Sequence, residues 1–504
     1  MNVDNCRSVI VRLRRIEPED RPGEVQTYKA EPSVPIFANF SAMNELIAAQ
    51  REYFLRGHTL PLATRKKHLR VLHDLLLNHE RTLADAIYKD FRKSFYTTIE
   101  NEISLPCGEI NRSIRHLKKW SSPRYVRTNL VNFPARSRVV PVPFGVTLVI
   151  APWNYPYMLS LIPAVSALAA GNTVILKPSE ITSNASGALA SLINEHFPRE
   201  LFHVVEGGVE ETTALLKEKF DKIFFTGSTG VGRIVMRAAA EHLTPVTLEL
   251  GGKNPVVVMP DCNLKKSARR IAWGKMHNNG SACVAPDHVY VHRTIKDQFI
   301  AELEKEFRFV LGNDPRNSVL TPRIINEKEF DRIHSMIDPG KVVFGGNSDR
   351  EDLYIEPTVM ADVTAGDEVM KREVFGPVLP LITFENVEHL ISSLKRQPTP
   401  VAIYIFSGNK GKAKRILREV PSGGGMVNDV VLQFINMNTP FGGMGESGMG
   451  RYHGRTGFEA FSHQKTILVK PTWFDLFLKY PPHREMNLKI IRTVLGRSIR
   501  NFWR

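Results

Sequence analysis

The sequence predicts an α/β protein built on mostly parallel sheets, and three observations lead to that fold class. Short apolar runs recur along the chain, helical segments separate them, and residues 139–176 contain no charged side chain. Buried parallel strands appear as continuous apolar runs because both of their faces are covered. Strands that alternate with helices in this way form parallel sheets.

The chain has 504 residues, of which 42% are hydrophobic and 24% are charged. At roughly 150 residues per domain this length allows two or three domains, and the composition is that of an ordinary globular protein. The four cysteines, Cys6, Cys107, Cys262 and Cys283, form no CxxC pair. We therefore expect free thiols in a reducing compartment, with neither a disulfide framework nor a metal site.

The net charge is +15, from 67 Lys and Arg against 52 Asp and Glu. Residues 471–504 hold seven of the basic and two of the acidic side chains, so this tail alone accounts for +5. Elsewhere the two signs are mixed, and no basic run is interleaved with aromatic residues. Because nucleic-acid binding needs a clustered basic footprint, we do not expect a nucleic-acid partner.

The first 35 residues do not have the pattern of a secretion signal. They mix basic residues such as Arg12 with acidic residues such as Glu17 and contain no long apolar core. The uncharged stretch at 139–176 is long enough to cross a bilayer, but five prolines between positions 141 and 163 would interrupt a single helix. We therefore expect an intracellular protein, cytoplasmic or peripherally bound to an internal membrane, that is not secreted and has no transmembrane helix.

Amphipathic helices are the first elements along the chain. Residues Ala42–Leu55 and Leu62–Phe91 are long, charged and periodic, which is typical of helices that precede a sheet. The apolar runs Val146–Ile150 and Thr173–Leu176 then predict buried strands, with the small-residue helix Pro163–Ala170 between them. These segments begin the alternation of strand and helix.

The same alternation continues in the middle of the chain. Apolar runs at Lys222–Thr226, Val246–Leu250 and Pro255–Met259 predict three more strands. The segment Val231–His242 predicts a helix between the first two of them, and Lys265–His277 predicts a helix that leads to Cys283. No repeat with a period of 20 to 50 residues is visible, so repeat architectures are not indicated.

Two segments at predicted strand ends have the composition of a nucleotide site. The run FFTGSTGVG at 224–232 places Gly227, Gly230 and Gly232 between a strand and a helix, where backbone N–H groups and a helix N-terminus can face a phosphate. Its GxxGxG spacing differs from the usual GxGxxG, and a plain tight turn is as compatible with it. Lys177 and Glu180 follow the predicted strand that ends at Leu176. They could bond ribose hydroxyls, or they could belong to a solvated loop.

Cys283 and Glu249 are candidates for a nucleophile and a base. The small neighbours of Cys283 in NNGSACVAPD leave space around its sulfur, although a free cysteine is more often a buried apolar residue. Glu249 ends an apolar strand directly before Gly251 and Gly252, where desolvation would raise the carboxyl pKa towards that of a base working near pH 7. The alternative for Glu249 is a surface carboxylate beside Lys253.

Taken together, these segments resemble the aldehyde dehydrogenase superfamily from about Ala42 to Pro471. The matching motifs are PWNYP (152–156), ILKPSE (175–180), FTGSTGVG (225–232), LELGGKNP (248–255), the Cys283 loop, EVFGPV (373–378) and PFGGMGESGMG (440–450). Near the C-terminus, SGMGRYHG (447–454), FSHQ (461–464) and KYPP (479–482) further resemble the class-3, or fatty aldehyde dehydrogenase, branch.

The resemblance implies a role for each matching residue. Cys283 is the nucleophile, the Asn154 amide and the Cys283 backbone N–H form the oxyanion hole, and Glu249 is the base for hydrolysis. The residues implied in cofactor binding are Trp153, Lys177, Glu180, Gly227, Ser228, Gly232, Glu373 and Phe375. Among these, Lys177 and Glu180 hold the adenosine ribose, Gly227 and Ser228 face the pyrophosphate, and Glu373 and Phe375 position the nicotinamide ribose and ring.

The implied reaction is oxidation of a hydrophobic aldehyde, medium- or long-chain, apocarotenoid or aromatic, to the acid through a thiohemiacetal and a thioester on Cys283. We expect NAD as the preferred cofactor, because Glu180 would repel a 2′-phosphate, with use of NADP left open because Lys177 offsets part of that repulsion. The family usually has Gln two residues before the cysteine, and Ser281 stands there in this chain. A non-catalytic relative with a binding or structural role is therefore the alternative function.

The resemblance also implies an aldehyde dehydrogenase-like fold in three parts, with a Rossmann-type cofactor domain, an α/β catalytic domain and a small β element for oligomerisation. Their expected extents are 36–120 and 143–248 for the cofactor domain, 249–440 for the catalytic domain, and 121–142 with 452–472 for the oligomerisation segments. In the last two segments TNLVNF (128–133) and TILVK (466–470) predict strands that would extend a partner's sheet in a homodimer.

The tail, 473–504, predicts an amphipathic basic helix that begins near Met486. It is too charged to span a bilayer, and two interpretations remain open: a gate over the substrate entrance, as in fatty aldehyde enzymes, or a contact with an anionic membrane surface. The apolar stripe comprises Met486, Ile490, Val494, Leu495, Ile499 and Phe502, with Lys489, Arg492, Arg497, Arg500 and Arg504 largely elsewhere.

Overall fold

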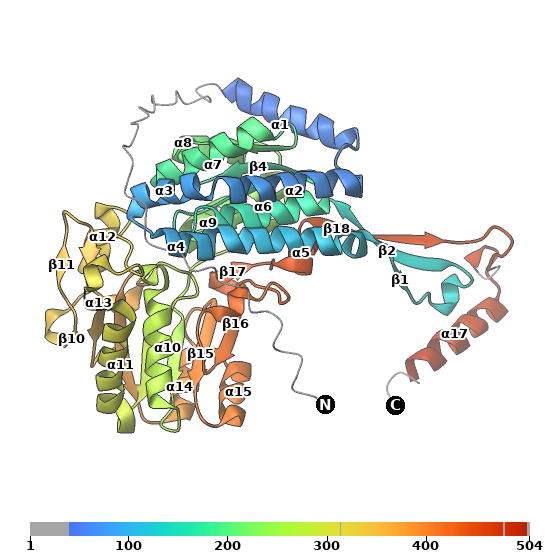
Figure 1. Cartoon of the computed structure of the whole chain (residues 1–504). Helices are drawn as coiled ribbons and strands as arrows, with labels where there is room; N and C mark the ends of the chain where they lie inside the picture. The colour runs from blue at the N-terminus through green and yellow to red at the C-terminus, as the bar shows by residue number, and fades with distance from the viewer. Residues whose placement is uncertain (1–39, 313, 477–478, 501–504) are drawn as a thin grey trace, which may run out of the picture.

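The computed structural model describes residues 40–312, 314–476 and 479–500. The predicted α/β class is confirmed, because two largely parallel sheets with helices beside them form the body of the molecule (Figure 1). A small antiparallel sheet projects from this body as an arm. The N-terminal segment considered above for a targeting signal lies outside the described residues.

The first large sheet has six strands in the order β17-β7-β6-β3-β4-β5. Its parallel strands are β3 (Val146–Ile150), β4 (Thr173–Lys177), β5 (Phe202–Val204), β6 (Lys222–Thr226) and β7 (Val246–Glu249), and the edge strand β17 (Gly448–Met449) runs antiparallel to β7. Every residue of β3, β4 and β6 is buried. Burial on both faces explains why these strands could be predicted from continuous apolar runs.

Helices precede and separate these strands. They are α1 (Phe40–Leu55), α2 (Leu62–Asn78), α3 (Glu80–Phe91), α5 (Ser104–Ser121), α6 (Met158–Ala170), α7 (Ser183–His196), α8 (Val209–Lys217) and α9 (Thr229–Glu241). The predicted helical segment 62–91 is divided into two helices at His79. Its Nδ1 lies 3.0 Å from the Leu75 carbonyl oxygen, so the ring bonds the last turn of α2 and ends it.

The second large sheet has seven strands in the order β10-β13-β14-β9-β8-β15-β16. These strands are β10 (Val342–Phe344), β13 (Thr358–Met360), β14 (Val378–Phe384), β9 (His288–His292), β8 (Pro255–Val258), β15 (Ala402–Phe406) and β16 (Gly424–Val427), beside helices α10 (Leu264–Met276), α11 (Lys296–Leu311), α14 (Val387–Leu394) and α15 (Lys410–Glu419). The strands β7 and β8 follow each other in the sequence but belong to different sheets. The short segment between them, 250–254, therefore crosses from one sheet to the other.

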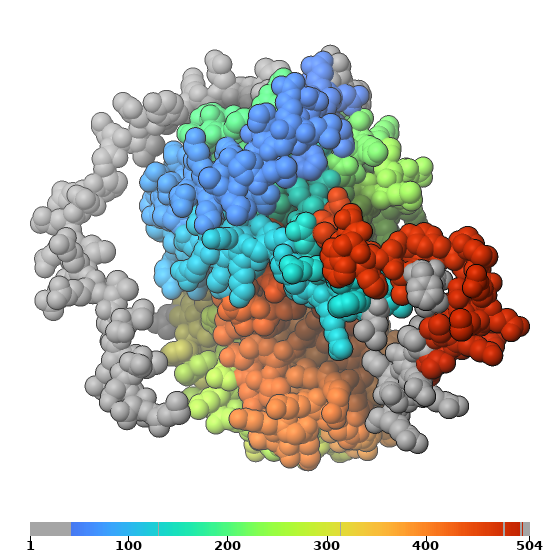
Figure 2. All heavy atoms as spheres, turned by 90° about the vertical axis from the view of Figure 1, so that its right-hand side faces the viewer, coloured from blue at the N-terminus to red at the C-terminus, as the bar shows by residue number. Residues whose placement is uncertain are grey.

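The arm consists of β1 (Arg124–Val126), β2 (Arg136–Pro143) and β18 (Ser462–Val469), all antiparallel. Figure 2, viewed from the side of the arm, shows the early and late segments of the chain lying side by side there. The predicted strand at 466–470 overlaps the second half of β18, which ends at Val469, but the predicted strand at 128–133 is wrong. Residues 130–132 form a short 3₁₀ helix instead, since Asn132 bonds Asn129 through both its backbone and its side chain. Such local asparagine bonds compete with a strand ladder.

The predicted tail helix is present as α17 (Glu485–Arg500), and it lies beside the arm rather than over the body of its own chain (Figure 1). Its apolar residues Met486 and Ile490 are exposed. Phe502 of the predicted stripe and Arg504 of the predicted basic residues lie outside the described residues. Within the ranges that the structure describes, no helix combines the length and the apolar character needed to cross a membrane.

Candidate active site

The carboxyl ends of four parallel strands bring most of the predicted residues to one edge of the first sheet. Ile150 at the end of β3 lies in register with Lys177 of β4 and Phe225 of β6, and Thr226 of β6 lies in register with Glu249 of β7. The turns that follow these strands carry Trp153, Asn154, Glu180, Gly227 and Ser228. This edge is where open α/β sheets bind ligands.

The cysteine loop reaches the same edge from the second sheet. After α10, Asn278 and Asn279 have φ of 52° and 53°, and Gly280 follows with φ of +75°. A Cβ on Gly280 would lie 2.2 Å from the Gly376 carbonyl oxygen, so only glycine fits. This tight turn delivers Cys283 to the edge of the first sheet, where the Asn154 amide contacts the loop.

The Asn154 side chain is buried and holds the cysteine loop directly. Its Nδ2 donates to the Ser281 carbonyl oxygen at 2.9 Å. The Asn278 amide donates in turn to the Asn154 carbonyl oxygen at 2.9 Å and to the Ser281 carbonyl oxygen at 3.1 Å. Because a carboxamide has two N–H groups, Asn154 keeps a second donor in addition to the one that Ser281 uses.

The Cys283 thiol is held protonated in this arrangement. Burial and the nearby carboxyl groups of Glu249 and Glu373 raise its pKa to about 12, while the backbone N–H groups of Cys283 and Val284 act in the opposite direction. Those two N–H groups therefore point towards the sulfur, where an oxyanion formed by addition to the thiol would also lie. The Cys283 carbonyl oxygen accepts from Asn254 Nδ2 at 2.7 Å, which fixes the backbone on the other side.

Glu249 is buried rather than a surface carboxylate beside Lys253. Its exposed fraction is 4%, its Oε1 has no hydrogen-bond partner among the described residues, and burial raises its pKa well above the usual range. Gly442 leaves the space beside it, since a Cβ there would lie 2.9 Å from Oε1. Lys253 is directed away and bonds Asp287 Oδ2 at 2.6 Å.

The segment that carries Glu373 and Phe375 lies against the crossing between the sheets. A Cβ on Gly251 would lie 2.2 Å from Glu373 Oε2. Burial and the Asp287 carboxylate raise the pKa of Glu373 to about 8, against the effects of the Gly252 N–H, Lys253 and Arg332. Glu373 can therefore change its charge near neutral pH.

An aromatic pair and one hydroxyl connect this segment to the rest of the site. The Phe375 and Trp153 rings meet edge to face with centroids 5.5 Å apart. The Ser281 hydroxyl donates to the Phe375 carbonyl oxygen at 3.3 Å. The unusual serine of the cysteine loop thus fastens that loop to the predicted nicotinamide segment.

Lys177 and Glu180 lie at the end of β4, within an acidic surrounding. Lys177 is 1% exposed, and its Nζ donates to the Pro178 carbonyl oxygen at 2.7 Å and lies 3.8 Å from Glu180 Oε2. Burial lowers the pKa of Lys177, whereas Glu180, Glu211 and Glu206 act to raise it. Three carboxylates around one ammonium group favour hydroxyl ligands over an additional phosphate.

The glycine-rich turn has the shape that a dinucleotide phosphate needs. Ser228 caps α9, its Oγ accepting from the Val231 N–H at 3.4 Å. A Cβ on Gly227 would lie 2.6 Å from the Phe225 ring, and one on Gly232 would lie 2.6 Å from Leu250 Cδ2. The first turn of α9 therefore packs closely on the sheet, with its N-terminus directed to the same edge. These residues and the acidic surrounding of Lys177 fit an NAD cofactor.

Sequence reasoning missed several residues of the site. Asn254 anchors the Cys283 backbone, and only its place in the LELGGKNP motif pointed to it. Tyr452 is 2% exposed, and Glu249 and Cys283 both raise its pKa, so it lies near both groups. Among the described residues, no group of three or more metal-binding side chains lies together.

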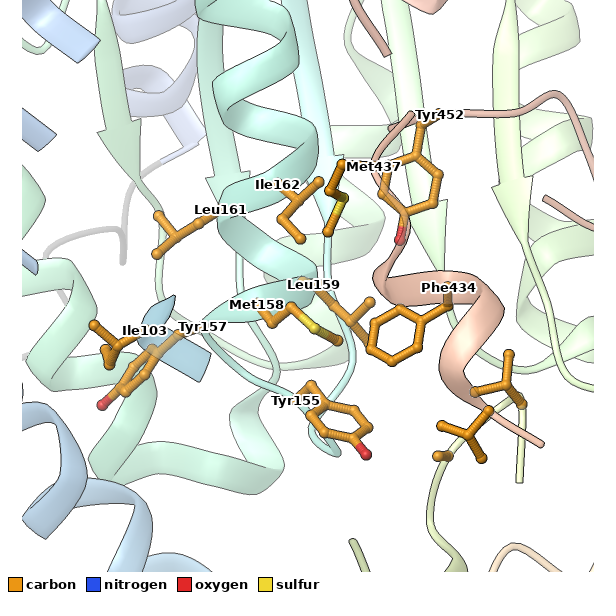
Figure 3. Close-up of a cluster of buried hydrophobic side chains, with 14 of the residues drawn as sticks. Ile103, Tyr155, Tyr157, Met158, Leu159, Leu161, Ile162, Phe434, Met437 and Tyr452 are labelled. Atoms are coloured by element: carbon orange, nitrogen blue, oxygen red, sulfur yellow. The ribbon is translucent and has the colours of Figure 1, made fainter. Parts of the chain in front are cut away.

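An apolar cluster lies beside the site. Figure 3 shows Met158, Leu159 and Ile162 at the beginning of α6 facing Phe434 and Met437 from the segment that follows β16. Tyr155 lies at the same end of α6, one residue from Asn154. A buried apolar cluster therefore lies next to the turn that carries Asn154.

The chain is similar to known proteins along most of its length. Residues 37–467 match the Aldehyde dehydrogenase family. The chain is 39% identical to 4,4'-diaponeurosporen-aldehyde dehydrogenase of Staphylococcus aureus over 86% of this chain and 95% of that protein. It is 41% identical to aldehyde dehydrogenase family 3 member A2 of Pongo abelii (86% and 90%) and 40% identical to the dimeric NADP-preferring aldehyde dehydrogenase of Canis lupus familiaris (88% and 98%).

Solved structures share the fold. The substrate-bound state of Staphylococcus aureus AldH matches with a TM-score of 0.88 and 38% identity, over 90% of this chain and 99% of that one. Indole-3-acetaldehyde dehydrogenase in complex with NAD+ matches with a TM-score of 0.77 and 27% identity, over 86% and 90%. The expected class-3 branch is confirmed by the family 3 relatives, and the expected fold by these structures.

Proposed function

Because the chain belongs to the aldehyde dehydrogenase family, we propose that it oxidises a hydrophobic aldehyde to the carboxylic acid through a thioester on Cys283. The enzyme is an NAD(P)-dependent aldehyde dehydrogenase. One observation supports the assignment of the site: the Asn154 amide bonds the loop that carries Cys283, and burial together with the carboxyl groups of Glu249 and Glu373 raises the pKa of its thiol.

The chemistry follows from these groups. The Cys283 thiol gives up its proton to solvent, and the resulting thiolate adds to the aldehyde carbon. A C–S bond forms and the carbonyl π electrons move to oxygen, where Asn154 Nδ2 and the Cys283 N–H stabilise the oxyanion. Bound NAD supplies the acceptor for the hydride that leaves when the carbonyl re-forms. Glu249 then takes a proton from water, the water oxygen attacks the thioester carbon, and the acid leaves as the thiol is restored.

A hydrophobic substrate is supported by the apolar cluster at the start of α6 (Figure 3). Phe434 and Met437 face this cluster from the segment that follows β16. The relative from Staphylococcus aureus carries the name of an apocarotenoid aldehyde enzyme, and other relatives are family 3 members. We infer a medium- or long-chain, apocarotenoid or aromatic aldehyde.

Preference for NAD over NADP rests on Glu180. A carboxylate 3.8 Å from Lys177 Nζ, with Glu206 and Glu211 near the same ammonium group, leaves little attraction for a 2′-phosphate. A relative named NADP-preferring shows that the family can use either cofactor. NADP is therefore expected as a weaker second acceptor.

The experiment that tests this function is absorbance of the reduced nicotinamide at 340 nm with a panel of aldehydes of increasing chain length. Cys283→Ala should abolish any signal, because the thioester cannot form. Cofactor binding without turnover of any aldehyde would favour the non-catalytic alternative. Ser281 no longer supports that alternative, because it bonds the Phe375 segment instead of leaving the loop loose.

The domain organisation is proposed to follow the sheets. We propose 36–120 and 143–248 for cofactor binding, 249–440 for catalysis, and 121–142 with 452–472 for a homodimer contact. The arm supports the dimer because it projects from the body and exposes Tyr125, Leu468 and Val469. Light scattering tests this, and a monomer at micromolar concentration would contradict it.

The tail is proposed to act as a gate or as a peripheral membrane contact. Since α17 lies beside the arm, a gate would have to cover the site of a second subunit and not its own (Figure 1). Met486 and Ile490 are exposed alongside Arg484, Lys489 and Arg492, which is the arrangement of an interfacial basic helix. Flotation with anionic and neutral vesicles separates the two roles.

A further inference from the structure

A buried ion pair lies beneath the turn that carries Asn154. Lys93 Nζ is 2.6 Å from Glu102 Oε1, and the two side chains are 1% and 0% exposed. Removing two charges from water is unfavourable, and a buried pair is often replaceable by apolar residues without loss of stability. A buried ion pair at this position therefore indicates a role other than stabilising the fold.

Glu102 lies in an unusual helical segment that directs its side chain towards Lys93. Ile99–Ile103 form a π-helical turn between α4 (Phe95–Thr98) and α5. Such turns hold one more residue than an α-helical turn and are frequent at functional sites. Glu102 is buried in this turn. Its sequence, IENEI, would by itself predict an exposed, charged helical surface.

The pair contacts the Asn154 turn on both sides of Pro156. Glu102 Oε2 accepts from the backbone N–H groups of Tyr157 at 3.1 Å and Met158 at 3.0 Å, at the N-terminus of α6. Lys93 Nζ lies 4.1 Å from the centroid of the Tyr155 ring. Figure 3 shows Tyr155, Tyr157 and Met158 together at this end of α6.

We propose that Lys93 and Glu102 are positioning residues that set the Asn154 amide against the cysteine loop. The inference rests on the proposed oxyanion role of Asn154. Asn154 bonds Ser281 through its side chain and accepts from Asn278 through its carbonyl oxygen. The residues that follow it in the turn are the ones that Lys93 and Glu102 hold. Without the carboxylate, buried N–H groups at the start of α6 lose their acceptor, and the turn has to move to satisfy them.

The test separates two reactions of the same thiol in the absence of cofactor. In acylation by p-nitrophenyl acetate, the sulfur adds to the ester carbonyl, an oxyanion forms, and p-nitrophenolate leaves with its electron pair. In alkylation by iodoacetamide, the sulfur displaces iodide directly and no oxyanion forms. Acylation is followed by absorbance of p-nitrophenolate, and alkylation by mass spectrometry of the Cys283 peptide.

Glu102→Gln should lower the acylation rate constant by about 10- to 100-fold. The single amide oxygen of Gln cannot accept from both Lys93 and the α6 N–H groups, and small displacements of a catalytic group have effects of that size. Alkylation should stay within about twofold, because it needs no oxyanion donor. Asn154→Ala should cost about 100-fold in acylation, and adding Glu102→Gln to it should cost no more than about twofold further, since both changes remove the same donor.

The matched control is Glu306→Gln. It breaks another ion pair with a buried carboxylate, Arg269–Glu306 at 2.5 Å between α10 and α11, and in the described part of the chain neither partner bonds the Asn154 turn or the cysteine loop. Acylation and alkylation by this variant should both match the wild type. If Glu102→Gln does not fold, Glu102→Asp keeps the charge beside Lys93 and withdraws the carboxylate from α6 by one methylene, and the same selective loss of acylation is expected.

Three results would overturn the inference: normal acylation by the Glu102 variants, equal loss of acylation and alkylation, or additive losses with Asn154→Ala. Each would mean that the pair supports the fold without setting the amide. The proposed function fails separately, because normal acylation by Asn154→Ala would remove the oxyanion role of Asn154 itself.

Discussion

The Cys283 thiol of the cofactor-free enzyme should react with iodoacetamide at pH 7 about three thousand times more slowly than an ordinary cysteine. With a pKa of about 12, only about one thiol in 10⁵ is ionised at pH 7, against about 3% for a free cysteine of pKa about 8.5. Since the thiolate is the nucleophile, the alkylation rate should rise about three- to tenfold for each pH unit from 7 to 11, least steeply between pH 8 and 9, where Glu373 becomes charged. Mass spectrometry of the Cys283 peptide measures that rate.

Glu373→Gln tests the cause of this suppression. The pKa of Glu373 is raised to about 8, so its carboxylate opposes the thiolate above that pH and is largely protonated below it. The variant should therefore lower the thiol pKa by about one unit and speed alkylation about tenfold at pH 9.5, with no change at pH 6.5. An alkylation rate that stops rising above pH 9, or equal acceleration at both pH values, would refute the reasoning. The control is Glu388→Gln, which should change neither rate. Glu388 is an exposed carboxylate on α14 that pairs with Arg415 on α15.

Three further predictions concern the base, the cofactor and the tail. Glu249→Gln should keep a first turnover with one reduced nicotinamide per site but slow steady turnover by about 10²- to 10⁴-fold, which stopped-flow absorbance and the mass of the acylated protein would show; undiminished steady turnover would contradict its role. In the wild type, whose Glu249 pKa is raised, thioester hydrolysis should accelerate with rising pH. Glu180→Gln should raise kcat/KM with NADP relative to NAD by about tenfold, and a clear NADP preference of the wild type would exclude the assigned role of Glu180. Deleting residues 486–504 should raise KM for long-chain far more than short-chain aldehydes if the tail is a gate, at about 0.8 kcal/mol per CH₂ left unburied. If the tail is only a membrane contact, kinetics in solution should stay unchanged while binding to anionic vesicles is lost, and equal losses for both aldehydes would contradict both roles.

The strands of the first sheet could be predicted because burial on both faces leaves an unbroken apolar run. Val146–Ile150 and Lys222–Thr226 are found with the predicted ends. The segment 128–133 (TNLVNF) also contains apolar residues with strand propensity, yet it is not a strand. Its asparagines bond one another, and a periodic pattern contains no information about such local competition.

The candidate site could be predicted as a set of residues but not as a set of contacts. Motif order identified Asn154, Glu249 and Cys283, because each falls at a predicted strand or helix end. The bond from Asn254 to the Cys283 carbonyl oxygen joins residues 29 positions apart. No sequence pattern predicted that Lys93 is buried, because its burial depends on a π-helical turn that hydrophobic periodicity does not reveal.

The crossing between the two sheets, residues 250–254, connects three groups of the site. It follows Glu249 directly, and it contacts the Glu373 carboxylate and the backbone of Cys283. Glu249 ends β7 in the first sheet, and the next residues run directly into β8 of the second. On the way, Gly251 leaves room for the Glu373 carboxylate, Lys253 bonds the Arg372 carbonyl oxygen at 2.9 Å, and Asn254 bonds the Cys283 carbonyl oxygen at 2.7 Å. Because these contacts are made by consecutive residues of one extended segment, a shift of any one of them moves the others with it. The distance between base and thiol is therefore set by the covalent spacing of the crossing and not by flexible side chains meeting across a cleft.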